Sequence, residues 1–257
     1  TKGEKLSPAL IGLIASAGLD SAPVHKVPKV AVIASGDEVV APGKPLTEGK
    51  LYASNMVEIC SWLTFFGLPY SAVLVGDSQQ EIQYAITTQL SEADAFVTSG
   101  GAWGSERDLI LGVVAKLEWQ GLYRRVRMGP GKPVGFGLLE QKPFFVLPGG
   151  PPSNEMAFLQ LALPAIMKMK GASGFSFPVI RAQLAETVRG HKDWTQFIHA
   201  RLEKEKDQLI VKPAKLKSRL ASMARKDALI IIPEGWEEWV AGEIIEIQLL
   251  NADFNYR

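Results

Sequence analysis

The sequence has little cysteine, little histidine and almost no excess of either charge. A single cysteine, Cys60, excludes an internal disulfide and a multi-cysteine zinc site, and favours a reducing compartment such as the cytoplasm. With 28 basic and 27 acidic residues the net charge is +1, which excludes nucleic-acid binding by bulk positive charge. The three histidines fall in separate segments without metal-ligand spacing, so we interpret them as structural or exposed.

Long apolar runs and a targeting segment are also missing. The longest apolar stretches, such as 228–233 and 144–148, are far shorter than the roughly 20 residues of a membrane span, so we expect no membrane partner. The first residues lack the apolar run of a signal peptide. They also lack an initiator methionine, and we therefore expect the chain to have been cut from something longer, or processed.

What is present indicates a globular protein of one large or two small domains. The 257 residues are 47% hydrophobic and 21% charged. Up to Gly171, short β-branched runs alternate with amphipathic stretches, which predicts a mostly parallel sheet flanked by helices over residues 1–171. After a small-residue linker at 171–174, strand-like runs separated by turns predict a small β-barrel-like domain over 172–257.

The predicted elements are short and closely spaced. Ser7 and Pro8 indicate the start of the first helix, and Ser78 with Glu81 fits a capping box. In the first domain we predict strands at 29–34, 70–75, 94–98, 123–128, 134–139 and 143–147, and helices at 6–17, 55–66, 78–90, 106–117 and 153–170. In the second we predict strands at 179–188, 196–203, 208–212, 228–232 and 243–250, with a helical stretch at 219–225.

Three carboxylates follow three consecutive predicted strands of the parallel sheet. They are Glu38, Asp77 and Asp108, and the carboxyl ends of parallel strands meet at one edge, where ligands bind in such folds. Hard oxygen ligands of this kind suit Mg²⁺. Each acid taken alone is more typical of solvated surface or of a helix cap, as Asp77 would be before Ser78, but the trio favours a functional site.

Glycine and proline shape the remaining loops at this edge. Ser99, Gly100 and Gly101 precede a helix, where backbone N–H groups bind phosphate, although a tight turn also selects glycine. Lys132 lies on a stiff loop between prolines and suits an oxyanion; the alternative is an exposed turn lysine. Pro148 and Pro151 would form a rigid cradle, or a turn with no ligand. The basic run 212–225 could meet an anion but is more typical of a solvated face.

These loops, in this order, resemble the MoeA family of molybdenum cofactor biosynthesis, which includes the E domain of gephyrin. The resemblance covers nearly the whole chain, from about Gly3 to Leu250. The matching motifs are VAVIASGDEV at 30–39, SN at 54–55, VGD at 75–77, TSGG at 98–101 with Asp108 downstream, PGKP at 130–133 and LPGGPPS at 147–153.

The resemblance implies a molybdopterin-binding fold and a specific activity. That activity is Mg²⁺-dependent insertion of molybdenum from molybdate into adenylylated molybdopterin, with Glu38, Asp77 and Asp108 as the acidic pocket for metal and molybdate. It further implies a homodimeric full-length protein and a molybdopterin-adenylylating protein as partner. In the implied site, Ser99, Gly100 and Gly101 hold the pterin phosphate, and Lys132, Pro148 and Pro151 line the pocket.

Several positions depart from the family pattern and leave alternatives open. Gly129 stands where members often have lysine, Trp103 where they have a small polar residue, and Ala53 where they have aspartate. In the last domain, Trp194 and His199 stand where basic residues are expected. The alternatives are therefore a non-catalytic molybdopterin-binding or scaffold paralogue, and a nucleotide-processing enzyme on the same fold, which the C-terminal stretch argues against.

Overall fold

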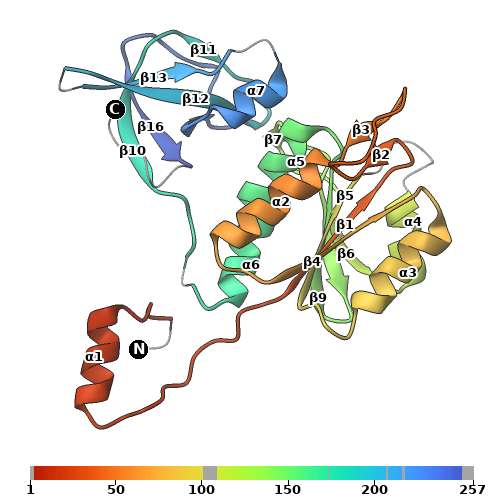
Figure 1. Cartoon of the computed structure of the whole chain (residues 1–257). Coiled ribbons are helices and arrows are strands. Elements are labelled where there is room, and N and C mark those ends of the chain that lie inside the picture. The colour runs from red at the N-terminus through yellow and green to blue at the C-terminus, as the bar shows by residue number, and fades with distance from the viewer. Residues whose placement is uncertain (1–2, 101–108, 173, 207, 216–217, 251–257) are drawn as a thin grey trace.

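Two six-stranded sheets organise the described residues: the first lies within residues 30–147, and the second takes β7 (Met128–Gly129) and strands within residues 179–249. The computed structural model describes residues 3–100, 109–172, 174–206, 208–215 and 218–250 (Figure 1). Within this part of the chain, no helix combines the length and apolar character that crossing a membrane requires. The first helix, α1 (Pro8–Ser16), lies apart from the α/β layers and buries no residue.

The first sheet is mixed, with four parallel strands followed by an antiparallel pairing. Its strand order is β4-β1-β5-β9-β8-β6, in which β4, β1, β5 and β9 run parallel and β8 pairs antiparallel with both β9 and β6. This confirms the predicted α/β class. The bounds are β1 (Val30–Ser35), β4 (Tyr70–Val75), β5 (Ala95–Ser99), β6 (Gln120–Tyr123), β8 (Gly135–Leu139) and β9 (Lys142–Leu147); the short pair β2 (Val39–Val40) and β3 (Leu51–Tyr52) lies beside it.

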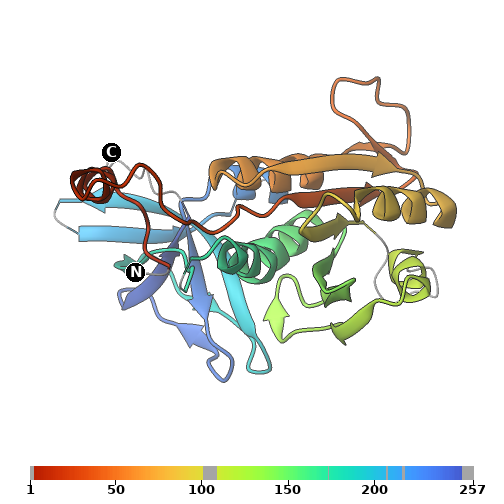
Figure 2. The ribbon, with the colours of Figure 1, turned by 90° about the horizontal axis from the view of Figure 1, so that it is seen from below.

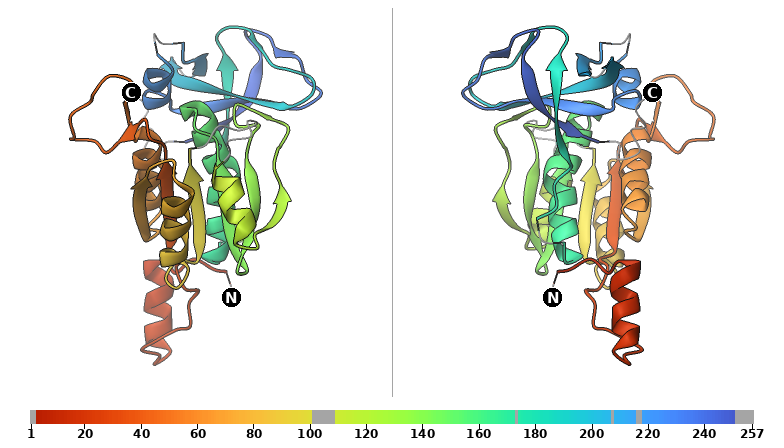
Figure 3. Two further views of the ribbon diagram at one scale, coloured as in Figure 1. Left: turned by 90° about the vertical axis from the view of Figure 1, so that its right-hand side faces the viewer. Right: turned by 90° about the vertical axis from the view of Figure 1, so that its left-hand side faces the viewer.

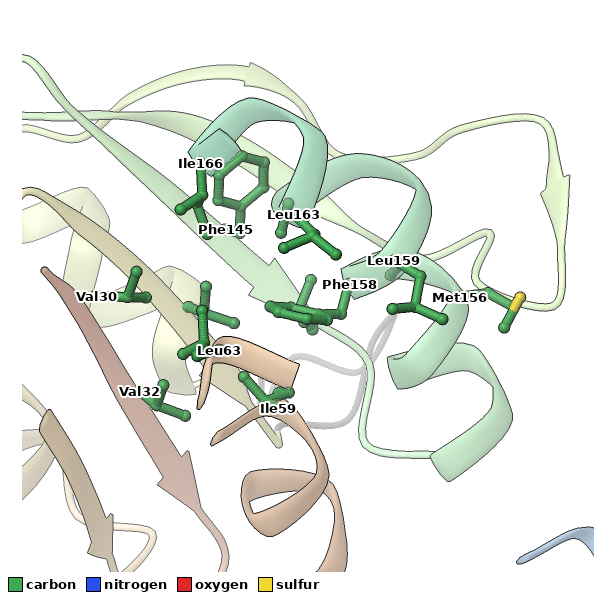
Figure 4. Packing of buried hydrophobic residues seen from close by; sticks show 14 of the residues in the cluster. Val30, Val32, Ile59, Leu63, Phe145, Met156, Phe158, Leu159, Leu163 and Ile166 are labelled. Carbon is green, nitrogen blue, oxygen red and sulfur yellow. The ribbon is translucent and has the colours of Figure 1, made fainter. Parts of the chain in front are cut away.

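Helices cover both faces of this sheet, so its central strands are apolar on both sides. On one face lie α2 (Ser54–Phe65) and the helix that follows β9, and they enclose a cluster that includes Val30, Leu63 and Phe158 (Figure 4). On the other face lie α3 (Gln79–Gln89) and α4 (Leu109–Lys116) (Figure 3). Burial on both faces explains why β1 and β5 read as continuous apolar runs.

The long helix predicted at 153–170 is interrupted. It consists of α5 (Pro151–Ala157), a π-helical segment at Phe158–Ala162, and α6 (Leu163–Met169). Pro164 supplies the reason, because it has no N–H and its ring would clash with the carbonyl of the residue four positions earlier in a regular α-helix. The wider π turn accommodates it without ending the helix.

Local signals at the helix starts were right in two places. Ser7 caps α1, its Oγ accepting from the Leu10 N–H at 3.2 Å, and Ser78 caps α3. In contrast, α2 starts after Ala53, whose side chain makes no cap. The strand predicted at 123–128 is wrong. The chain leaves the sheet at Tyr123, and Met128–Gly129 forms β7 in the other sheet.

The second sheet closes into a small barrel, as predicted. Its order is β13-β10-β16-β14-β12-β7, and β13 also pairs with β12. Figure 2 shows its strands, in cyan and blue, beside the α/β part. The enclosed core includes Ala200, Ile230 and Ile247, all fully buried. The elements are β10 (Val179–Leu184), β11 (Val188–Arg189), β12 (Thr195–Glu205), β13 (Gln208–Pro213), α7 (Arg219–Ala224), β14 (Ala228–Ile232), β15 (Glu238–Trp239) and β16 (Ile244–Leu249).

Main-chain and side-chain contacts join the barrel to the α/β part. Strand β7 pairs in parallel with the start of β12, matching Met128 with Thr195. Gln160, in the π segment, donates to the Gln248 side chain at 2.7 Å. Leu229 and Leu250 of the barrel belong to the same apolar cluster as α2 and α5. The barrel is therefore packed against the α/β part and is joined to it by more than the connecting segment.

Candidate functional site

The carboxyl ends of the parallel strands meet at one edge of the first sheet. Ser35 at the end of β1 is in register with Val75 of β4, and Ser99 of β5 pairs with Leu147 of β9. The loops that the sequence singled out after these strands therefore lie at the same edge. Geometry of this kind is where α/β sheets bind ligands.

Two backbone N–H groups of the loop after β4 donate to carboxylates at this edge. Asp77 donates its N–H to Asp37 Oδ1 at 3.0 Å, and Gly76 donates its N–H to Glu81 Oε2 at 2.9 Å. Asp37 and Glu81 were not among the predicted site residues, although Asp37 lies next to Glu38 in the quoted motif. Asp37 ties the β1 loop to the β4 loop, while Glu81 fixes the turn between β4 and α3.

The predicted metal site is only partly within the described residues. Glu38 and Asp77 are exposed in these loops, while Asp108 and Gly101 lie outside the described part of the chain. Among the described residues, no three histidine, cysteine or acidic side chains are grouped so that they could hold a metal ion. Exposed carboxylate oxygens still fit Mg²⁺ chemically, since that ion takes one or two carboxylates plus water and phosphate. The trio therefore stays a prediction.

Ser99 is the centre of a neutral polar contact that we call the Ser99 junction, formed by Ser99, Asn55 and Asn154. Asn154, only 2% exposed, donates to Ser99 Oγ at 3.0 Å and to the Pro148 carbonyl at 2.9 Å. Asn55 donates to the Gly149 carbonyl at 2.8 Å and lies 3.4 Å from Ser99 Oγ. The junction ties the end of β5 to α2 and to the loop between β9 and α5. The sequence offered no signal for Asn154.

Gly100 is required by its surroundings. Its φ of +124° lies in the region that side chains disfavour, and a Cβ there would stand 2.2 Å from the Ser35 carbonyl oxygen. The close approach of the β5 and β1 ends explains this glycine without any ligand. The phosphate role predicted for Ser99 and Gly100 is compatible with this geometry but is not needed to explain it.

A groove of about 900 Å³ runs between the α/β part and the barrel. On one side it is lined by the PGKP loop and by Gly150, Pro152 and Ser153 before and within α5. On the other side it is lined by β11, β12, the end of β13 and α7. The loop between β9 and α5 thus has one end in the Ser99 junction and the other in the groove.

The charged residues of the groove wall are all basic. Lys132, Arg189, Lys215 and Arg219 line it, and no Asp or Glu is among the described lining residues. Two of these cations have acidic partners outside the lining: Arg189 Nε is 3.3 Å from Glu238, and Lys215 Nζ is 2.7 Å from Glu186. The groove therefore carries positive charge suited to an anion. Lys215 and Arg219 belong to the basic run that the sequence left open between a solvated face and an anion contact.

Trp194 forms an aromatic surface in the same groove. His191 stacks on it at 3.6 Å between ring centroids, and Lys132 Nζ lies 4.9 Å from the ring centroid. The indole N–H donates to Gln196 Oε1 at 3.1 Å. A Cβ on Gly129 would stand 2.7 Å from Trp194 Nε1, so Trp194 fills the space that a side chain at 129 would need.

A buried charged group, the Glu155 cluster, lies behind the groove and comprises Glu58, Glu155, His199 and Lys226. Glu155 Oε2 is 3.0 Å from His199 Nε2, and Glu155 Oε1 forms an ion pair with Lys226. The Glu155 side chain is fully buried, and those of Lys226 and His199 are 8% and 13% exposed. His199 also lines the groove. Our interpretation of the histidines as structural or exposed did not anticipate that His199 would line the groove and also contact a buried carboxylate.

The two carboxyl groups of the cluster titrate in opposite directions. Burial, together with the neighbouring Glu155 carboxylate, raises the pKa of Glu58 to about 8. Burial alone would also raise the pKa of Glu155, but hydrogen bonds with His199 and Glu58 and the charge of Lys226 lower it to about 2. At neutral pH, Glu155 is therefore ionised, while Glu58 holds a proton that it donates to Glu155.

The structure thus separates the predicted site residues into two places. Lys132 lines the groove, whereas Glu38, Asp77, Ser99 and Gly100 lie at the sheet edge. Pro148 holds its carbonyl in the Ser99 junction, and Pro151 starts α5. Cys60 is buried. The sequence left the basic run with Lys215 and Arg219 open as an anion contact, but it did not place that run beside Lys132, because their proximity depends on how the barrel packs.

Family models match both halves of the chain. Residues 31–168 match a model described as a probable molybdopterin binding domain, and residues 181–250 match the MoeA C-terminal region (domain IV). The chain is 34% identical over 178 residues to the molybdopterin molybdenumtransferase of Haemophilus influenzae, covering 69% of this chain and 44% of that protein. It is 30% identical over 260 residues to the molybdenum cofactor synthesis protein cinnamon of Drosophila melanogaster, covering 96% of this chain and 42% of that protein.

A solved structure supports the same assignment. The MoeA protein of Pyrococcus horikoshii is 29% identical with a TM-score of 0.82, covering 98% of this chain and 62% of that one. The chain thus spans less than two thirds of the length of these relatives. The matched models and relatives together show that the chain belongs to the MoeA family, with an α/β domain of the probable molybdopterin binding type followed by the family's C-terminal domain.

Proposed function

We propose that this chain acts in molybdenum cofactor biosynthesis as part of a molybdopterin molybdenumtransferase, with one domain over residues 1–171 and a second over residues 172–257. The reaction would insert molybdenum from molybdate into adenylylated molybdopterin. The observation that carries the proposal is the groove, whose described charged lining is wholly basic and includes Lys132. The match of residues 181–250 to the MoeA C-terminal region favours this function over a nucleotide-processing enzyme on the same fold.

The groove is suited to the phosphates of such a substrate. Lys132 and Arg219 would bind phosphate oxygens, while Trp194, with His191 stacked on it and Lys132 over its ring, would form a fixed part of the groove wall. The short loop from Pro148 to Ser153 would connect the groove to the sheet edge, where Ser99, Gly100 and Gly101 would hold the pterin phosphate. Pro148 and Pro151 would keep that loop rigid.

Mg²⁺ and molybdate belong to the sheet edge in this proposal. Glu38, Asp77 and Asp108 would hold the metal, and Mg²⁺ would there neutralise phosphate and oxyanion charge. The chain's own contribution is to bind and orient: fixed cations and backbone N–H groups would bring two anions together without reorganising. A homodimer and a molybdopterin-adenylylating partner are part of the same proposal, since they concern the full-length protein.

The test is a calorimetric titration of adenylylated molybdopterin, with Mg²⁺ and molybdate, into the wild-type chain and its variants. We expect Lys132→Ala to weaken binding about tenfold, the loss of one charge-assisted contact. Asp108→Ala should weaken the Mg²⁺-dependent part of binding only. Lys116→Ala is the matched control, because that lysine bonds to Gln79 on the other face of the sheet. Equal affinities for wild type and Lys132→Ala would refute the proposal.

A second candidate function, a non-catalytic molybdopterin-binding or scaffold paralogue, is favoured by one observation. Trp194 occupies the space beside Gly129, so the groove has an indole where a cation at 129 would otherwise reach. Complementation separates the two functions. Rescue of a molybdenumtransferase-deficient strain by the full-length protein supports the enzyme, whereas pterin binding without rescue supports the paralogue.

A further inference from the structure

His199 is shared by the groove and by the Glu155 cluster. It lines the groove, and its Nε2 is 3.0 Å from Glu155 Oε2. The four members of the cluster come from four elements: Glu58 from α2, Glu155 from α5, His199 from β12, and Lys226 from the turn between α7 and β14. Two belong to the α/β part and two to the barrel, so the cluster crosses the same junction that forms the groove.

We propose that Glu155, held by Lys226 and Glu58, is a positioning residue that fixes His199 and, through Lys226, helix α7 in the groove wall, so that anion binding in the groove depends on the balance of charge in the cluster. This inference rests on the proposed anion-binding function of the groove. It concerns residues to which neither the family models nor the relatives' names give a role.

Both carboxylate oxygens of Glu155 are engaged, which leaves the side chain little freedom. One oxygen contacts His199 and the other contacts Lys226, and the side chain is fully buried. Lys226 also donates to the Met223 carbonyl at 2.9 Å, so it ties the end of α7 to the cluster. Helix α7 places Arg219 and Ser222 in the groove. Glu155 therefore acts on the groove by two routes, through His199 and through α7.

The proton on Glu58 keeps the cluster electrically balanced. At neutral pH, Glu155 carries one negative charge opposite Lys226, and Glu58 is neutral and donates to it. Above about pH 8, Glu58 becomes a second carboxylate beside the first. The groups that face this pair are Lys226 and His199, while neighbouring Asp227 turns its carboxylate to the Leu202 N–H at 3.0 Å. An added buried charge without an added partner loosens such a contact.

The first experiment needs no ligand. The pKa of Glu58 is raised above its unfolded value of 4.5, so ionisation costs stability progressively from pH 4.5 to about 8. Glu58→Gln keeps the shape and the hydrogen-bond donor but cannot ionise. We expect its urea midpoint to equal that of wild type at pH 5 and to exceed it by about 0.5 M or more at pH 9. If the urea midpoints of wild type and Glu58→Gln differ by the same amount at pH 5 and at pH 9, the proton linkage of the cluster is overturned.

The second experiment measures the groove. The probe is AMP, whose phosphate is a dianion throughout the range tested, and its dissociation constant is measured at pH 7.5 and 9.5. Between pH 7.5 and pH 9.5 we expect the affinity of wild type for AMP to fall about fivefold, and that of Glu58→Gln to fall much less. At pH 7.5, Glu155→Gln should bind AMP more weakly than wild type does. Both proteins are compared under a condition in which urea unfolding curves show them to be folded. Glu92→Gln, in the exposed pair with Lys29, is the matched control and should follow wild type.

The outcomes separate the two proposals. No AMP binding by wild type at either pH overturns the proposed function and the groove half of this inference, even if the urea midpoints diverge as expected. Binding that falls equally in wild type and in Glu58→Gln overturns the inference alone. Binding that is unaffected by Glu155→Gln overturns its positioning role.

Discussion

Two neighbouring residues of α5, Asn154 and Glu155, enter two different buried junctions. Asn154 points to the Ser99 junction, where neutral amides and a hydroxyl join three segments of the α/β part. Glu155 points to the barrel, where charges from both halves of the chain meet. Successive residues of a helix are about 100° apart, so one turn can serve both contacts.

The two junctions differ in their polar groups, which are neutral in the Ser99 junction and charged in the Glu155 cluster. The Ser99 junction lies within the α/β part, has no titrating group, and should hold its geometry at any pH near neutrality. The Glu155 cluster lies between the α/β part and the barrel and depends on matched charge, because a buried ion is tolerated only with partners. The geometry of the Ser99 junction is therefore independent of protonation, while that of the Glu155 cluster depends on it.

Glu155→Gln should have the largest effect and would break the charged side of this comparison. It keeps the side-chain volume but leaves Lys226, 8% exposed, without its counterion. We expect the free energy of unfolding at pH 7 to fall by about 3–5 kcal/mol, as for other broken buried pairs. Urea unfolding followed by circular dichroism measures it. A loss no larger than that of Glu92→Gln would show that the cluster contributes little.

The pH dependence of that loss sharpens the same point. The pKa of Glu155 is lowered to about 2 from 4.5, so its stabilising contribution is complete above pH 4.5 and is lost as the pH falls toward 2. The stability gap between wild type and Glu155→Gln should therefore be widest above pH 4.5 and should narrow below it. Unfolding curves at several pH values between 2.5 and 6 test this. A constant gap would mean that ionisation of Glu155 is not what stabilises the junction.

Asn154→Ala should cost less and should be indifferent to pH. It removes the donors to Ser99 Oγ and to the Pro148 carbonyl, two buried acceptors. We expect a loss of about 1–3 kcal/mol, the usual cost of unsatisfied buried polar groups. The loss should be the same at pH 5 and pH 9. A pH-dependent loss would contradict the separation between the two junctions.

Gly129→Ala should have the smallest effect and would probe the join of β7 to β12. The new Cβ would stand 2.7 Å from Trp194 Nε1 and 3.0 Å from Gln196 Oε1, so the indole must shift. We expect a loss of about 1 kcal/mol together with a changed near-ultraviolet dichroism of tryptophan. Combining it with Trp194→Ala should remove most of the loss. If it does not, the strain lies in the backbone and not at the indole.

Much of the α/β part could be predicted from local signals. Strand β4 matches its predicted bounds, and Ser7 and Ser78 cap their helices, because apolar periodicity and capping are properties of neighbouring residues. The strand predicted at 123–128 failed for a non-local reason. The β7 segment pairs with a partner more than 60 residues away in the sequence, which no local pattern reveals.

The sequence by itself determined the fold class, the order of the loops at the sheet edge and the place of Lys132 on a stiff basic loop, since each depends on residues that are close along the chain. Only the tertiary structure decided that His199 meets Glu155, and that Lys132 shares a groove with Arg219. Those contacts arise where the barrel packs on α2 and α5. The packing of two apolar surfaces is set by the shape of the whole interface, so it could not be inferred from any one segment.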